Sequence, residues 1–259
     1  MVLVPDYARR IFHESNVDMP AALKTDSSCD LTLYHQAGGS GKGVLVVTVI
    51  CSLTFKPTKG AAGRWLTWTQ ADKTSFMGGM PKACAEVWNE KHRITTTSTV
   101  PAVTDVGVIF NVRVSENMSI FSHSHWNLTV SKASNWEESS VHGGGGGFAW
   151  NGEATFDSQD NTGYEKATGV TKQRDSVHEL GHMLGYRDEY LSTAGAVVDN
   201  PAWTTDLHSI MNRGETVRDR HYTMLANWIT EQYKPAGHLA GELILFKVNG
   251  TLTMGAARL

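Results

Sequence analysis

This 259-residue chain has little cysteine and no long apolar run. Its three cysteines, Cys29, Cys51 and Cys84, are odd in number and lack the spacing of a cysteine metal site, so we expect free thiols rather than a disulfide framework. No stretch approaches the roughly 18 apolar residues of a membrane-spanning helix. The formal net charge is only −3, and the basic residues form no cluster beyond the short run 213–220. This composition excludes a membrane span and gives no support to nucleic-acid binding.

The N-terminal segment, residues 1–15, lacks the apolar core and small-residue cleavage site of a secretory signal peptide. We therefore expect a protein that is cytoplasmic as synthesised, or one that is exported by a leaderless route, as a delivered toxin is. Charged residues make up 19% and hydrophobic residues 41% of the chain, which is an ordinary globular balance. A chain of this length is long enough for one sizeable core.

The most informative pattern lies in residues 178–188, which read H-E-x-x-H-x-x-G-x-x-D. At about 3.6 residues per turn, His178 and His182 lie one turn apart on the same helix face, so their imidazoles can converge on one metal ion. Two neutral imidazoles suit Zn²⁺, which in a catalytic site takes three protein ligands and keeps a fourth position for water. Glu179 is adjacent to the first ligand and can reach that water as a general base.

The later fixed letters of the pattern concern the third ligand. Gly185 lets the chain leave the helix through a left-handed turn, where a residue with a Cβ is strained. That turn brings Asp188 back toward the metal as an oxygen ligand. A chance match of the complete pattern in a chain of this composition has a probability of about one in ten thousand. The apolar residues around the ligands predict a buried helix with one metal-bearing stripe.

Other residues remain open as metal ligands. Zinc favours imidazole, and a turn one residue longer replaces Asp188 by its neighbour. Three residues can therefore take its place: His208, His221 and Glu189. Another group of histidines consists of His123, His125 and His142. His123 and His125 alternate at an expected strand end and could hold a second metal ion, but ordinary surface histidines are the favoured interpretation.

A second segment, residues 209–214, reads S-I-M-N-R-G. With it, the chain resembles the metzincins, zinc endopeptidases in which H-E-x-x-H-x-x-G-x-x-(H/D) precedes a methionine-bearing turn. Aspartate as the third ligand is similar to the snapalysin-like branch. The resemblance rests on residues 175–214 and implies that Met211 lies beneath the metal as a packing residue, not a ligand. It also implies a protein or peptide substrate.

Hydrophobic periodicity predicts the remaining elements. The expected strands are 44–55, 107–114, 125–131 and 153–157, and the expected helices are 71–91, 172–185 and 219–233. Gly78, Gly79 and Pro81 weaken the first half of the first helix. Asn249-Gly250 predicts a C-terminal hairpin over 243–253, and the five-glycine run 143–147 predicts a loop.

The order of these elements fits the metzincin layout. The expected fold is α/β (α+β), a twisted mixed sheet packed on two helices, with an active-site helix, a methionine turn and a C-terminal helix. We expect one metallopeptidase domain over 1–259, with an N-terminal extension at 1–40, a catalytic core at 41–235 and the hairpin at 236–259. By the same resemblance, 152–157 is the edge strand that binds an extended peptide, although 143–157 is equally readable as a surface loop.

These residues together predict a zinc-dependent endopeptidase. The rival hypotheses are a zinc amide hydrolase on another H-E-x-x-H fold and a non-catalytic zinc-binding module. Glu179 argues against the module, because a purely structural site needs no base. Some metzincins hold the oxyanion with a tyrosine two residues after the turn methionine, but here Arg213 stands at that position. The better donors by residue type are Tyr190, His221 and Tyr222.

Overall fold

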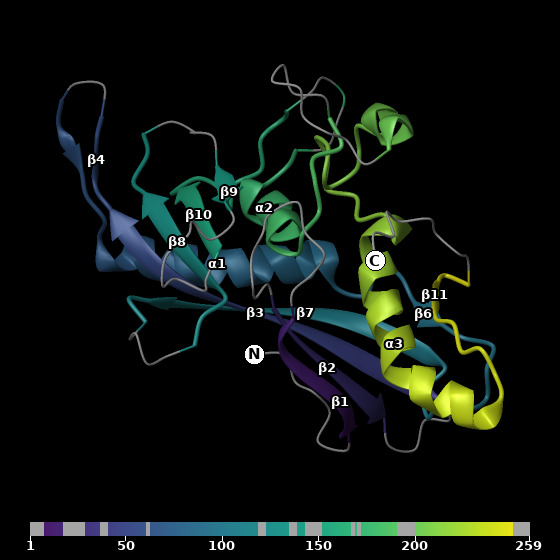
Figure 1. The fold of residues 1–259 in the computed structure, drawn as a ribbon. Coiled ribbons are helices and arrows are strands. Elements are labelled where there is room, and N and C mark those ends of the chain that lie inside the picture. The colour runs from purple at the N-terminus through teal and green to yellow at the C-terminus, as the bar shows by residue number, and fades with distance from the viewer. Residues whose placement is uncertain are drawn as a thin grey trace.

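The computed structural model describes residues 8–17, 29–36, 41–60, 63–118, 123–134, 139–142, 152–166, 169, 172–190 and 200–250. Over these residues a curled mixed sheet packs with three α-helices, so the expected α+β class is confirmed (Figure 1). No helix among the described residues combines the length and the apolar character needed to cross a membrane.

The large sheet has the strand order β11-β6-β7-β3-β8-β10-β9, with β2 also pairing with β3, and β1 with β2. Its strands are β1 (Ala8–Val17), β2 (Cys29–Gln36), β3 (Lys42–Lys56), β6 (Ile94–Thr95), β7 (Asp105–Glu116), β8 (Trp126–Ser131), β9 (Ser140–His142), β10 (Gly152–Asp157) and β11 (Lys247–Val248). A separate hairpin joins β4 (Thr58–Lys59) to β5 (Trp65–Leu66).

Strand β3 forms the centre of the sheet and pairs in parallel with β7 and with β8. Its alternate residues Leu45, Val47 and Val49 are fully buried on the core face, as the β-branched run predicts. The expected strands at 44–55, 107–114, 125–131 and 153–157 are all confirmed. The three cysteines are buried free thiols, as expected, and burial raises the pKa of Cys84 to about 12.

Helix α1 (Gln70–Trp88) confirms the expected helix and contains both glycines and the proline. It begins at a capping box, in which Thr69 and Asp72 bond reciprocally through side chain and backbone. Gly79 allows Asn161 to approach the helix closely, since a Cβ there would lie 3.1 Å from the Asn161 amide nitrogen. The capping box therefore fixes the start of a helix whose two glycines and proline have low helix propensity.

The other helices are α2 (Asp175–Met183) and α3 (Thr223–Ala240), with short 3₁₀ turns η1 (Pro201–Thr205) and η2 (Asp219–Tyr222). Helix α3 follows η2 directly, continues through Pro235 and ends at Gly241 in the left-handed conformation (φ 69°). The expected helix at 219–233 is therefore present, but it begins with η2 and extends to Ala240.

The N-terminal part of the chain differs from the expectation. Residues 1–40 were expected to form no regular element, whereas β1 and β2 are antiparallel strands and β2 extends the sheet beside β3. In β2, buried Leu31 and Leu33 flank Thr32, an alternation typical of a strand.

The expected edge strand is also wrong. Strand β10, at 152–157, pairs in parallel with β8 on one side and antiparallel with β9 on the other. The short strand β9 is therefore the outermost strand of the described sheet on that side. The chain returns through 139–142 to cover β10, and residues 143–147 lie outside the described part.

At the C-terminal end, β11 pairs with β6. Asn249 and Gly250 adopt positive φ angles of 49° and 74°, as an Asn-Gly turn requires. The expected return strand at 251–253 lies outside the described residues.

Candidate metal site

Helix α2 brings His178 and His182 together, as the i, i+4 spacing predicts. Their Nε2 atoms lie 3.1 Å apart. Gly185 takes a positive φ of 89°, which turns the chain so that Asp188 faces both rings. The Asp188 Oδ1 atom lies 3.2 Å from His178 Nε2 and 3.3 Å from His182 Nε2. The three predicted ligand atoms therefore form a nearly equilateral triangle.

The rings are oriented so that both Nε2 lone pairs point into this triangle. His178 donates its Nδ1 proton to the carbonyl of Ile210 (2.7 Å), and His182 donates to the carbonyl of Tyr186 (2.7 Å). Such outer hydrogen bonds fix the tautomer of a metal-binding histidine. Two lone pairs and a carboxylate oxygen at this distance repel one another unless a cation or a proton lies between them.

The triangle has the dimensions that zinc requires. With metal–ligand bonds of about 2.0 Å, the ligand atoms of a tetrahedral zinc lie about 3.3 Å apart, which matches the separations here. The donor set of two imidazoles and one carboxylate also suits zinc. Protons compete for the same atoms: burial opposes charge on His182, but Asp188 outweighs it and raises the pKa of His182 to about 9.

Glu179 lies beside these ligands and is buried, with only 5% of its surface exposed. One of its carboxylate oxygens lies within 4.8 Å of a ligand atom of each histidine. Its Oε2 atom has no hydrogen-bond partner among the described residues. Burial raises the pKa of Glu179, while the two histidines oppose that shift. A buried carboxylate with a raised pKa and a free oxygen is suited to accept and return a proton.

The methionine turn closes beneath α2. Asn212 and Gly214 each donate a backbone N–H to the carbonyl of Ser209, which closes the turn. Met211 is fully buried, and a Cβ on Gly181 would lie 2.1 Å from its sulfur. The turn is joined to the loop that carries Asp188 by a hydrogen bond from the Glu189 N–H to the Met211 carbonyl (2.8 Å). The structure thus places Met211 against α2, the helix that carries His178 and His182.

The alternative third ligands lie elsewhere. The Glu189 carboxylate accepts two hydrogen bonds from Arg220 (2.6 Å each) and one from His221 Nε2 (3.2 Å). The Nδ1 atom of His221 accepts the backbone N–H of Arg218 (3.0 Å), so both ring nitrogens are occupied. The side chain of His208 is exposed. Of the four candidates, Asp188 is the one that the structure brings to both helix histidines.

The three residues predicted to stabilise an oxyanion differ in their contacts. The fully buried Tyr222 donates its hydroxyl hydrogen bond to the carbonyl of Trp88, and His221 is committed to Glu189. Tyr190 remains close to the site, because its ring stacks on His178 with centroids 6.5 Å apart. Tyr190 is therefore the predicted donor whose ring contacts a predicted zinc ligand.

The second histidine group has a different composition from the one expected. Asp30 joins His123 and His125, whereas His142 lies on β9 and bonds to Ser140. The Nδ1 atom of His125 accepts the backbone N–H of Ile50 (2.9 Å), so the neutral ring carries its proton on Nε2 and donates it to Asp30 (3.1 Å). Burial lowers the pKa of His125, which favours this neutral form. A protonated Nε2 cannot bind a metal, so the geometry favours a structural Asp–His pair.

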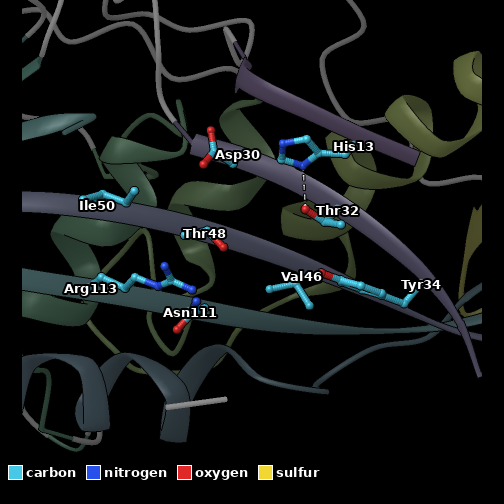
Figure 2. Close-up of a pocket in the computed structure, with 9 residues that line it drawn as sticks. All are labelled: His13, Asp30, Thr32, Tyr34, Val46, Thr48, Ile50, Asn111 and Arg113. Carbon is cyan, nitrogen blue, oxygen red and sulfur yellow. Dashed lines mark hydrogen bonds between the residues drawn. The ribbon is translucent and has the colours of Figure 1, made fainter. Parts of the chain in front are cut away.

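A cavity of about 210 Å³ lies beside this pair. Its floor includes Thr48 and Ile50 of β3, which alternate with the core residues Val47 and Val49. The cavity therefore opens on the sheet face opposite the core. Figure 2 shows polar residues that line it from three strands, β1, β2 and β7: His13, Asp30, Thr32, Tyr34, Asn111 and Arg113. None of the residues His178, Glu179, His182 and Asp188 lines it.

One buried residue that the sequence analysis missed is Gln173. Its side-chain amide lies 2.9 Å from the Ile210 carbonyl, 2.6 Å from that of Gly214 and 3.4 Å from that of Asn212. A glutamine before a helix carries no motif signal, so only the folded turn reveals this role. Gly181 was missed for the same reason.

No family model matches the chain, no curated protein matches it, and no solved structure matches it.

Proposed function

We propose that this protein is a zinc-dependent endopeptidase of the metzincin type. The observation that carries the proposal is the triangle of His178 Nε2, His182 Nε2 and Asp188 Oδ1, with sides of 3.1, 3.2 and 3.3 Å. The adjacent carboxylate of Glu179 distinguishes this site from a purely structural one. The left-handed Gly185 and the buried Met211 agree with the resemblance drawn from the sequence.

The protein groups have separate tasks in peptide hydrolysis. When bound, zinc supplies Lewis-acid chemistry, lowering the pKa of water from near 16 toward about 7 and polarising the scissile carbonyl. Glu179 accepts the proton of the attacking water and returns it to the leaving amine. The Ile210 and Tyr186 carbonyls hold the two imidazoles in the tautomer that faces the metal. We assign the donor to the developing oxyanion to Tyr190, whose ring stacks on His178.

The edge of the sheet offers a binding surface for an extended peptide. Strand β9 contacts α2, and the two lie side by side in Figure 1. It is the outermost described strand beside β10, so its outer backbone groups can pair with one more strand. An extended peptide bound there would run along the ligand helix. We therefore place the peptide at β9 rather than at 152–157.

Glu179→Gln tests the proposal directly. The change keeps the size of the side chain but removes the base, so peptide hydrolysis should fall by about 10²–10⁴-fold while zinc stays bound. Cleavage of a mixed peptide library, measured with the zinc content of the same samples, provides the readout. Near-normal cleavage by zinc-loaded Glu179→Gln would contradict the mechanism.

The peptide library also separates the rival functions. A zinc amide hydrolase acting on small amides should leave extended peptides intact. A non-catalytic module should bind zinc and cleave neither class of substrate.

A further inference from the structure

Gln173 ties the start of the ligand helix to the methionine turn. It lies two residues before α2 and is fully buried. Its backbone is held by a pair of hydrogen bonds with Tyr164, at 2.9 and 3.1 Å. Its side-chain nitrogen donates to the carbonyls of Ile210 and Gly214, so one amide bonds both arms of the turn. Gln173 thus joins the start of α2 to Tyr164 through its backbone and to the methionine turn through its side chain.

The Ile210 carbonyl links Gln173 to the metal site. It accepts the Nδ1 proton of His178 at 2.7 Å and the amide of Gln173 at 2.9 Å. A carbonyl oxygen has two lone pairs, so both donors can bind at once. We propose that Gln173 is a positioning residue for the zinc ligand His178, acting through the Ile210 carbonyl; this inference rests on the proposed zinc site.

The orientation of the Gln173 amide supports this role. Its Oε1 atom is buried without a hydrogen-bond partner among the described residues. Leaving a buried acceptor unsatisfied is unfavourable. The amide keeps this orientation because the opposite one would point its oxygen at three carbonyl oxygens. The hydrogen bonds to the turn therefore determine how the side chain is placed.

The effect on zinc follows from the geometry. Without the Gln173 amide, the Ile210 carbonyl loses one of its two fixed donors and is free to tilt. The His178 ring then loses a fixed direction for its Nδ1 hydrogen bond. Loss of an outer hydrogen-bonding partner of a metal ligand typically weakens metal binding by about 10–100-fold.

Gln173→Leu tests the inference, with Asn212→Leu as the matched control. Asn212 is also fully buried in the turn, and its amide also donates to backbone carbonyls, those of Glu189, Trp203 and Thr204. None of these three carbonyls accepts a hydrogen bond from a zinc-binding histidine. Both variants should lower the unfolding temperature of the metal-free protein. A change in zinc affinity should be confined to Gln173→Leu.

Two measurements provide the readout. Competition with a chromophoric chelator gives the zinc affinity, and the absorption spectrum of the Co²⁺-substituted protein reports the ligand geometry. We expect Gln173→Leu to weaken zinc by about 10–100-fold and to alter the Co²⁺ spectrum. Asn212→Leu should keep the wild-type spectrum and an affinity within about threefold of wild type, since its amide bonds neither a zinc-binding side chain nor a carbonyl that a zinc-binding histidine bonds. Gln173→Met, which keeps an unbranched side chain, replaces the leucine variant if that variant does not fold.

The outcomes separate this inference from the proposed function. A folded Gln173 variant with wild-type zinc affinity and spectrum would overturn the positioning role and leave the zinc site standing. Equal weakening in Asn212→Leu would also overturn it, because the effect would then be general to the turn. A wild-type protein that binds no zinc would overturn both.

Discussion

The sulfur of Met211 occupies the space that a side chain on Gly181 would need, since a Cβ there would lie 2.1 Å from that sulfur. Gly181 is in the middle of α2, where glycine is otherwise unfavourable, and Met211 is fully buried beneath it. The glycine is therefore explained by packing rather than by backbone conformation. The helix and the turn approach each other so closely because this one position has no side chain.

Gly181→Ala should therefore destabilise the protein although alanine favours helices. Displacing Met211 in a packed core should lower the free energy of unfolding by about 1–3 kcal/mol. Thermal unfolding of the wild type and the variant measures this. The matched control is Gly78→Ala in α1, where no atom lies within 4 Å of the added Cβ. That control should be neutral or stabilising by up to about 1 kcal/mol, and equal destabilisation of both variants would contradict the packing explanation.

Substitution of neighbouring acids should identify the third ligand. Asp188→Ala removes an oxygen at the triangle and should strip zinc as fully as His182→Ala does. Glu189→Gln alters the bonds to Arg220 and His221 and should lower stability while zinc remains. Metal analysis after gel filtration compares the variants. Stoichiometric zinc in Asp188→Ala, with zinc lost from Glu189→Gln, would reverse the assignment.

Tyr190→Phe should slow catalysis without changing zinc content. Removing one donor to the transition state typically lowers turnover by about 10²–10³-fold with little effect on substrate binding. Steady-state kinetics on a cleaved peptide gives kcat and KM separately. Tyr222→Phe is the control, because its hydroxyl bonds to Trp88 in the core, and it should affect stability rather than turnover. Unchanged turnover in Tyr190→Phe would leave the zinc alone to stabilise the oxyanion.

Asp160 should make stability depend on pH. It is fully buried; burial raises its pKa to about 9 and nearby Asp157 adds to the shift, although a hydrogen bond from Ser139 opposes it. The folded state thus holds a proton that the unfolded state, with a pKa near 3.8, releases. The contribution of Asp160 is fully present below pH 3.8 and is lost as pH rises toward 9.

Asp160→Asn removes this titration while keeping an oxygen that can accept the same hydrogen bonds. Its stability relative to wild type should therefore increase as pH rises from 5 to 9. Urea unfolding at several pH values measures the difference. A difference that stays constant over this range would contradict the shifted pKa.

The clustering of His178, His182 and Asp188 could be predicted from the sequence because its determinants are local. One helical turn separates His178 from His182, and Gly185 sets the path to Asp188, so residues within eleven positions specify the triangle. Gln173 and Gly181 could not be predicted, because their roles depend on contacts with the turn about 30 to 40 residues later in the chain. Local spacing carries no information about which carbonyl a buried amide will meet.

The fold shows the same division between local and distant determinants. Periodicity predicted strands β3, β7, β8 and β10 but not β1 or β2. It did not predict that strand β9 would pair with β10, because pairing depends on how the chain returns to the sheet. The alternation in β2 was present in the sequence but was not used, and the helix α3 continued past its expected end through Pro235.

Metal analysis of the purified protein, combined with peptide cleavage before and after chelation, tests the central claim most directly. The account predicts one zinc per chain, cleavage of extended peptides, loss of cleavage on chelation and recovery when zinc is restored. A protein that contains no zinc and takes up none, or one whose cleavage is unaffected by complete removal of zinc, would contradict it.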